Sequence, residues 1–217
     1  MYLAIEGVIG VGKTTLARLL QPVFQADVLL EVFEENPFLS DFYSDRQRYA
    51  FQTQIFFLLS RYHQQRRAAP SILSAGVNLI ADYTFEKDAL FAGINLFGDE
   101  LETYHQVHEA LAEKIPPPDL VVYLRADVDT LMERITTRDR PYERNMERDY
   151  IAELNRAYED FFADHRARRS PVLALDTNHL DYVHQVDDLR EVENRIRQAL
   201  KIVPFQPELG LEVPGEA

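Results

Sequence analysis

The residues with the clearest chemical potential lie near the N-terminus, where a lysine and a threonine end a run rich in glycine. Residues 7–14 read G-V-I-G-V-G-K-T and match the pattern G-x-x-x-x-G-K-[ST]. Glycines let successive backbone N–H groups turn inward around phosphate oxygens, and the N-terminus of a following helix adds partial positive charge. The pattern therefore predicts a site that binds a nucleoside triphosphate.

Each position of this loop has an expected part in binding. Lys13 is expected to bridge the β- and γ-phosphates and so to act in catalysis, and the Thr14 hydroxyl is expected to bind Mg²⁺. A glycine-rich turn with an exposed lysine is the alternative, but a candidate strand precedes this loop and a candidate helix follows it. The residues expected to hold the phosphates are Gly7, Val8, Ile9, Gly10, Val11, Gly12, Lys13, Thr14 and Thr15.

Short apolar runs alternate along the chain with longer segments of helical periodicity, which is typical of βαβ units with a parallel sheet. The candidate strands are residues 2–6, 28–32, 77–81, 120–124 and 172–175, and the longer candidate helices are 46–66, 99–115 and 181–200. The last three strands are nearly continuous hydrophobic runs, as expected of strands covered on both faces. The sequence predicts an α/β fold of the P-loop type, with a doubly wound, five-stranded parallel sheet and helices on both faces.

Charge and composition limit the possible partners. The chain has 36 acidic and 23 basic residues, and its formal net charge of −13 repels nucleic acid and anionic membranes alike. It has no cysteine, which fits a reducing compartment, and no apolar run long enough to cross a bilayer. Because Met1 leads directly into the loop without a cleavable signal, we expect a cytoplasmic protein that binds small molecules.

One domain is expected over residues 1–203, followed by a loosely held tail at 204–217 that contains Pro and Gly without periodicity. The basic residues are partly clustered at 61–67, 134–144 and 166–169. For the first and third clusters, solvated helix faces are the simpler interpretation, whereas the second could bind an anion.

Several further blocks occur in the order found in the deoxynucleoside kinases, and the chain resembles that family from the loop to about Val183. The blocks are Glu31 with 34–39, 42–45, 51–54 with 59–61, 82–84 with Asp88, 118–124, Arg134 with 138–140 and Glu143, Tyr150, and 171–176. The resemblance implies transfer of the γ-phosphate of ATP, with Mg²⁺, to the 5′-hydroxyl of a deoxynucleoside in nucleotide salvage. It also implies a homodimer, with the helices around 46–66 and 99–115 as possible contact surfaces. Residues 34–39 are similar to bacterial members that accept purines, which favours deoxyadenosine and deoxyguanosine and leaves deoxycytidine possible.

Glu31 lies at the end of the second candidate strand, where open α/β sheets bind their ligands. The resemblance implies that it is the general base that takes the proton of the 5′-hydroxyl. Glu34 and Glu35 are the competing carboxylates, and Glu31 is preferred for its spacing to Asn36.

The resemblance also assigns residues to the sugar and the nucleobase. It implies that Gln54 presents an amide, one donor and one acceptor, to the edge of the base, with Gln52 as the competing glutamine. Tyr43 and Glu143 resemble the pair that holds the 3′-hydroxyl, and Asp88 resembles an acid near the base. By residue type alone, Tyr43 would more often be a core residue, and both acids would more often be solvated.

Arg134, Arg138 and Arg140 look like the lid of the family, a basic segment at about 134–146 that closes over the triphosphate. Arg134 and Arg138 are four residues apart and therefore project from one face of a helix. The resemblance implies that both bind the donor, and that Arg138 and Arg140 stabilise charge on the transferred group. Capping of the helix C-terminus is the alternative.

The chain departs from the family at the end of the third strand, where most members have an acid, an arginine and a serine. Here the triplet is Asp82-Tyr83-Thr84. Asp82 can still help to hold Mg²⁺. Tyr83 stands where the family has an arginine beside the catalytic carboxylate and the nucleobase, and it brings no positive charge. If residues 83–88 begin a helix, Lys87 lies one turn further on and could return the missing cation.

Two other functions remain open from the sequence. A nucleoside monophosphate kinase of the thymidylate type shares the loop, sheet and lid, but it would need cations around the acceptor phosphate. A regulatory nucleotide switch would use the loop without transfer, which would leave Glu31 and Gln54 without a purpose.

Overall fold

The computed structural model describes residues 1–144, 146–164 and 169–203. The predicted tail at 204–217, Asn145 of the lid and most of the third basic cluster lie outside these residues. Five strands form one parallel sheet in the order β2-β3-β1-β4-β5. They are β1 (Tyr2–Glu6), β2 (Ala26–Leu29), β3 (Asn78–Ala81), β4 (Leu120–Arg125) and β5 (Val172–Asp176). The predicted fold class is confirmed.

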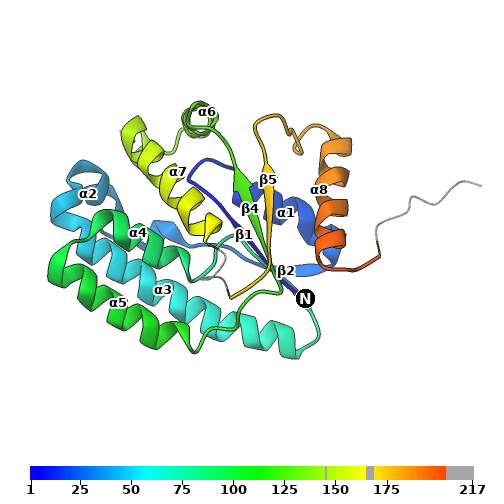
Figure 1. The fold of residues 1–217 in the computed structure, drawn as a ribbon, viewed down its shortest axis with the longest axis horizontal. Helices are drawn as coiled ribbons and strands as arrows, with labels where there is room; N and C mark the ends of the chain where they lie inside the picture. Colours follow the sequence, from blue (N-terminus) through cyan, green and yellow to red (C-terminus); the bar gives the residue numbers. More distant parts are fainter. Residues whose placement is uncertain (145, 165–168, 204–217) are drawn as a thin grey trace, which may run out of the picture.

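Helices cover both faces of this sheet (Figure 1). On one side lie α1 (Lys13–Phe24) and α8 (Val186–Ala199), and on the other lie α3 (Arg46–Ser74), α4 (Lys87–Asn95), α5 (Gly98–Ala112) and α7 (Arg148–Ala163). The short helix α2 (Leu39–Ser44) packs against α3, and α6 (Val128–Arg138) follows the carboxyl end of β4. Two 3₁₀ turns complete the order, η1 (Phe33–Glu35) and η2 (Pro141–Glu143).

Strands β3 and β4 are largely buried on both faces, as their apolar runs predict, but the same expectation is wrong for β5, an edge strand in which only Leu175 is buried. All five residues of β1 are buried, and so are the first five of β4. Leu3, Ile5 and Val122 have no exposed surface at all. Burial of apolar surface of this kind is the main favourable contribution to folding, so the sheet centre fixes the frame from which the loops project. Among the described helices, none combines the length and apolar character that crossing a membrane would require.

The boundaries of several elements differ from the predicted ones. Strand β2 covers residues 26–29, not 28–32, because the N–H of Glu31 donates to Asp82 Oδ1 (2.8 Å) and leaves the ladder. Helix α3 continues eight residues past the predicted end at 66, through Pro70. Helix α8 begins at Val186, five residues after the predicted start. Glu31 therefore lies in the connection after β2.

Candidate active site

The glycine-rich loop has a backbone that only glycine adopts easily. Gly7, Gly10 and Gly12 have φ values of 145°, 90° and 103°. A Cβ atom at Gly7 would lie 2.4 Å from the carbonyl oxygen of Leu124, so a side chain there would collide with the backbone of β4. The Lys13 ammonium donates to the carbonyl oxygens of Gly7 (2.7 Å) and Val8 (3.2 Å), which places it inside the curve of the loop. The loop has the conformation that phosphate binding requires.

One cavity beside the loop collects most of the residues predicted from the sequence. Its lining includes residues of the loop, of the connections after β2 and β3, of α3 and of the segment after α6. The predicted residues that line it are Ile9, Gly10, Lys13, Thr14, Glu31, Tyr43, Gln54, Asp82, Arg138, Arg140 and Glu143. The other predicted residues, Gly7, Val8, Val11, Gly12, Thr15, Tyr83, Asp88 and Arg134, are not among those that line it.

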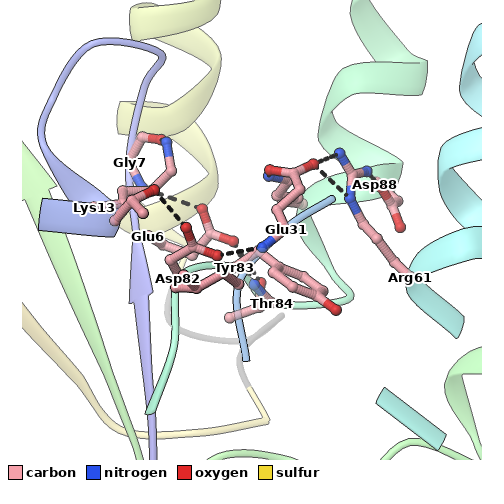
Figure 2. Close-up of polar contacts among 12 residues, drawn as sticks. Glu6, Gly7, Lys13, Glu31, Arg61, Asp82, Tyr83, Thr84 and Asp88 are labelled. Carbon is pink, nitrogen blue, oxygen red and sulfur yellow. Dashed lines mark hydrogen bonds and ion pairs between the residues drawn. The ribbon is translucent and has the colours of Figure 1, made fainter. Parts of the chain in front are cut away.

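Glu31 is held by two cations on the wall of this cavity. Its Oε1 accepts hydrogen bonds from Arg61 Nε (2.9 Å) and from the Arg61 NH2 group, and its Oε2 accepts one from Lys87 Nζ (2.7 Å). Figure 2 shows the Glu31 carboxylate turned toward Arg61. Burial alone would raise the pKa of Glu31, but the charges and hydrogen bonds of Arg61 and Lys87 outweigh it and hold this pKa well below the usual range. Glu31 is therefore ionised throughout the physiological pH range.

Arg66 and Arg67 of the first basic cluster are exposed, as a solvated helix face predicts, but for Arg61 that interpretation is wrong. Its side chain is buried, it forms an ion pair with Asp88 as well as with Glu31, and its guanidinium lies 4.5 Å from the centre of the Phe57 ring. Arg61 follows Gln54 by seven residues on α3, which is two helical turns, so both side chains lie on one face of the helix. That spacing is the signal by which the sequence could have placed Arg61 in the site.

Asp88 and Tyr83 lie outside the cavity, although both were expected to contact the acceptor. Asp88 is fully buried and is linked to the site by its ion pair with Arg61. Tyr83 packs in a small apolar cluster beside β2 and β3, and its hydroxyl donates to Gln64 Oε1 (2.7 Å). Tyr83 continues the alternation of β3, because it shares this apolar cluster with Leu79 and Ala81. The Asp82 side chain instead accepts from Thr14 at the loop. The structure thus does not place Tyr83 where it would touch a substrate.

Lys87 reaches the site in a different way from the one predicted. Helix α4 begins at Lys87 itself, not at Tyr83. Residues 82–86 form a turn instead, in which the Thr84 N–H donates a hydrogen bond to Glu6. The Lys87 side chain is 5% exposed and lines the cavity with its ammonium on Glu31. The hypothesis that Lys87 brings a cation to this carboxylate agrees with the geometry.

The three lid arginines separate into two groups. Arg138 donates to both carboxylate oxygens of Glu143 (2.7–3.2 Å), and Arg140 lies 3.7 Å from the same carboxylate. Arg134 instead donates to the carbonyl oxygens of Val11 (3.3 Å) and Thr177 (2.7 Å), on the outer side of the loop. Arg138 and Arg140 are thus available to a ligand in the cavity, whereas Arg134 supports the loop backbone.

Thr14 and Asp82 are the residues expected to hold Mg²⁺, and they contact each other. The Thr14 hydroxyl donates to Asp82 Oδ2 at 2.5 Å. Within the described part of the chain, no group of three or more His, Cys, Asp or Glu side chains could hold a metal by itself. Mg²⁺ commonly takes one or two protein ligands and completes its shell with water and phosphate oxygens, so this pair fits the ion when a nucleotide is bound.

Comparisons with known proteins identify the family. The deoxynucleoside kinase family model matches residues 3–201. The deoxyguanosine kinase of Bacillus subtilis is 33% identical over 92% of this chain and 97% of its own length. The deoxyadenosine kinase of Dictyostelium discoideum is 34% identical over 80% of this chain and 71% of its own length. A solved structure of deoxyadenosine kinase from M. mycoides, with products dCMP and dCDP bound, superposes with a TM-score of 0.78 at 26% identity and covers 91% of this chain and 99% of that one.

The chain belongs to the deoxynucleoside kinase family. The prediction made from the sequence blocks is confirmed, and the chain is an enzyme that transfers phosphate. A deoxynucleoside kinase is neither a non-catalytic switch nor a monophosphate kinase, so the family excludes both alternatives. In this deoxynucleoside kinase, Glu6 and Arg61 are the site residues that sequence reasoning did not assign.

The protonation of Lys13 predicts how binding of ATP depends on pH. Burial and the charge of Lys87 lower the pKa of Lys13 to about 8, against the opposing effect of Glu6, Glu31 and Asp82. Above this pH the side chain loses the charge that binds phosphate. We expect the Kd for ATP to rise roughly tenfold between pH 7 and pH 9, as for a single group with this pKa. Calorimetry at both pH values measures it.

The matched control for this prediction is Lys13→Arg. A guanidinium stays protonated over the whole range, so the affinity of this variant for ATP should be nearly constant between pH 7 and pH 9. A wild-type affinity that does not change over this range would contradict a lowered pKa for Lys13.

Proposed function

We propose that this deoxynucleoside kinase transfers the γ-phosphate of ATP to the 5′-hydroxyl of a purine deoxynucleoside, with deoxycytidine as a possible acceptor, in the salvage of nucleotides. The observation that carries the proposal is that Lys13 and Glu31 line the same cavity. A cation for the donor phosphates and a carboxylate for the acceptor hydroxyl therefore face one space. The names of the relatives from Bacillus subtilis and Dictyostelium discoideum support a purine acceptor.

Glu31 serves as the general base. The 5′-oxygen forms a bond to the γ-phosphorus, the bond from that phosphorus to the bridging oxygen of ADP breaks, and the hydroxyl proton passes to Glu31. Because Arg61 and Lys87 hold the pKa of Glu31 low, this carboxylate is ionised throughout the physiological pH range but is a weak base. A weak base suffices, since phosphoryl transfer proceeds through a loose transition state that depends mainly on positioning and charge.

The donor side consists of the loop amides, Lys13 and the lid. Arg138 and Arg140, which line the cavity, stabilise negative charge on the transferred group. Thr14 and Asp82 would hold Mg²⁺, which neutralises phosphate charge when it is bound with the nucleotide. Arg134 acts on the donor site through the backbone of Val11.

The acceptor side consists of an amide, a sugar site and aromatic walls. Gln54 is buried in the cavity wall, and its amide has no hydrogen bond to any described residue, so it is available to the edge of a nucleobase. Tyr43 and Glu143 line the same cavity and hold the 3′-hydroxyl. Phe57 and Phe91 line it as well and provide apolar faces for the base.

We also propose that the enzyme acts in the cytoplasm as a homodimer. Exposed apolar side chains on α3 and directly before α5 support an interface: Leu59 of α3 is 41% exposed and Phe97 is 75% exposed.

The experiment that tests the function measures ADP release with ATP and Mg²⁺ in the presence of deoxyadenosine, deoxyguanosine, deoxycytidine, dTMP or no acceptor. We expect turnover with the purine deoxynucleosides and little with dTMP. Glu31→Gln should lower kcat by roughly 10²- to 10⁴-fold, as for removal of a general base. Glu35→Gln, which changes an exposed glutamate nearby, is the control and should retain full activity. Turnover with dTMP alone, or unchanged activity of Glu31→Gln, would sink the proposal.

Lys87 is the cation that replaces the arginine found in most members of the family. Lys87→Met should lower kcat by roughly 10- to 10³-fold, because charge near the transferred group is lost. The acid limb of the pH–rate profile should also move to higher pH, since Glu31 loses one of the two cations that depress its pKa. Stopped assays of kcat from pH 4 to pH 8 measure both effects.

Lys114→Met is the matched control, because Lys114 is an exposed lysine after the end of α5. It should retain the kcat and the pH profile of the wild type. If Lys87→Met does the same, Lys87 has no part in transfer.

A further inference from the structure

Glu6 is a buried carboxylate that takes no direct part in the proposed transfer. It is the last residue of β1, is 1% exposed and directly precedes the phosphate loop. Its Oε2 accepts hydrogen bonds from Gly7 N and Tyr158 OH (both 3.1 Å), and its Oε1 accepts them from Thr84 N (2.6 Å) and Thr84 Oγ1 (3.1 Å). No ion pair of Glu6 with a basic side chain occurs within the described ranges. A buried carboxylate held only by donors of fixed position has a tightly defined place.

The partners of Glu6 belong to three different parts of the site, and two of them, Gly7 and Thr84, are labelled in Figure 2. Gly7 begins the phosphate loop, and its carbonyl oxygen accepts from Lys13 Nζ at 2.7 Å. Thr84 lies on the short connection between β3 and α4, which begins with Asp82 and leads directly into Lys87. Tyr158 comes from α7 and lines the cavity. One carboxylate therefore joins the donor side, the acceptor side and a wall of the cavity.

We propose that Glu6 is a positioning residue that fixes the phosphate loop relative to the connection between β3 and α4. This inference rests on the proposed function. The connection places Lys87 on Glu31 and places Asp82 on both Thr14 and the Glu31 backbone, so a shift between it and the loop would misalign the acceptor hydroxyl and the γ-phosphorus. A misplacement of about 1 Å can cost roughly 10²-fold in rate.

A misaligned site also admits a competing reaction. The oxygen of a water molecule can then form the bond to the γ-phosphorus, while the bond to the bridging oxygen of ADP breaks and phosphate and a proton are released. The fraction of ADP formed without transfer to the sugar, here called the hydrolysed fraction, thus reports how well the donor and acceptor sides are aligned. Measurements of stability do not report this alignment.

The test uses Glu6→Gln in the full chain. The amide keeps the shape of the side chain, but its NH2 group must face the N–H of either Gly7 or Thr84, and two donors cannot bond to each other. We expect kcat for transfer to fall by roughly 10- to 100-fold, and the hydrolysed fraction to rise several-fold. The Kd values for ATP and deoxyadenosine should change by less than roughly threefold, because the groups that contact them remain.

Glu193→Gln is the matched control. Glu193 is another buried glutamate, 7% exposed, which pairs with Arg197 on α8. Its replacement should lower the thermal stability and leave kcat and the hydrolysed fraction at the values of the wild type.

Two single variants keep the inference testable if Glu6→Gln does not fold. Thr84→Val and Tyr158→Phe each remove one hydroxyl that donates to Glu6, and each should raise the hydrolysed fraction less than Glu6→Gln does. Glu6 has no positioning role if the wild type transfers phosphate and Glu6→Gln keeps the kcat and the hydrolysed fraction of the wild type. The same conclusion follows if Glu6→Gln does not fold and both single variants keep these values. A wild type without acceptor-dependent ADP release would overturn the proposed function, and this inference with it.

Discussion

Neutralisation of buried charge is the constraint on which the acceptor side of this enzyme depends. Two anions, Glu31 and Asp88, and two cations, Arg61 and Lys87, lie together with side-chain exposures between 0% and 16%. Removing one partner from such a group leaves an unpaired buried charge and lowers the free energy of unfolding by about 3–5 kcal/mol. Because the four side chains come from the connection after β2, from α3 and from α4, their pairing also fixes where these elements lie relative to one another. The position of Glu31 is thus a result of charge balance.

A second set of contacts holds the backbone of the same segment. Asp82 accepts the N–H of Glu31, and Tyr83 bonds to Gln64, whose amide donates to the carbonyl oxygen of Leu30 at 3.4 Å. Asp82 and Tyr83, which directly follow β3, therefore hold the segment of Glu31 from opposite sides: Asp82 by a direct hydrogen bond and Tyr83 through Gln64. The tyrosine that stands in the arginine position of the family supplies no charge, but it still supports the segment that carries Glu31.

The parts of the structure that follow from local sequence could be predicted, and the parts that depend on distant partners could not. The loop and the five strands have signals within a few residues, namely glycine spacing and apolar runs. Helical spacing puts Arg61 on the same face of α3 as Gln54, but it does not give the reason for its burial. That reason is that Glu31 and Asp88, far away in the sequence, supply its counter-charges. Glu6 likewise owes its role to Thr84 and Tyr158. The end of β2 differs from the predicted one for the same reason, since the side chain of Asp82, directly after β3, takes the N–H of Glu31.

Lys87 shows how a local rule can succeed for a different reason from the one that suggested it. Helical spacing from Tyr83 predicted that the Lys87 ammonium could return the missing cation to the same face. The helix, however, begins only at Lys87. The side chain is directed to Glu31 by the turn before α4 and by aromatic neighbours, with the ammonium 5.7 Å from the ring centre of Tyr83 and 5.9 Å from that of Phe91. Aromatic faces attract a cation, so Tyr83 helps to position the charge that it does not itself provide.

The same charge balance bears on which acceptor can enter. Arg61 and Lys87, the two cations that contact Glu31, are already engaged by carboxylates of the buried cluster. A nucleoside monophosphate would bring a dianion toward Glu31, and like charges 4 Å apart repel by about 4 kcal/mol per pair at an effective dielectric constant of 20. An uncharged hydroxyl enters without breaking an ion pair, because it only has to donate a hydrogen bond to a carboxylate. The pairing that holds the proposed base in place therefore also favours a neutral nucleoside over its phosphate ester.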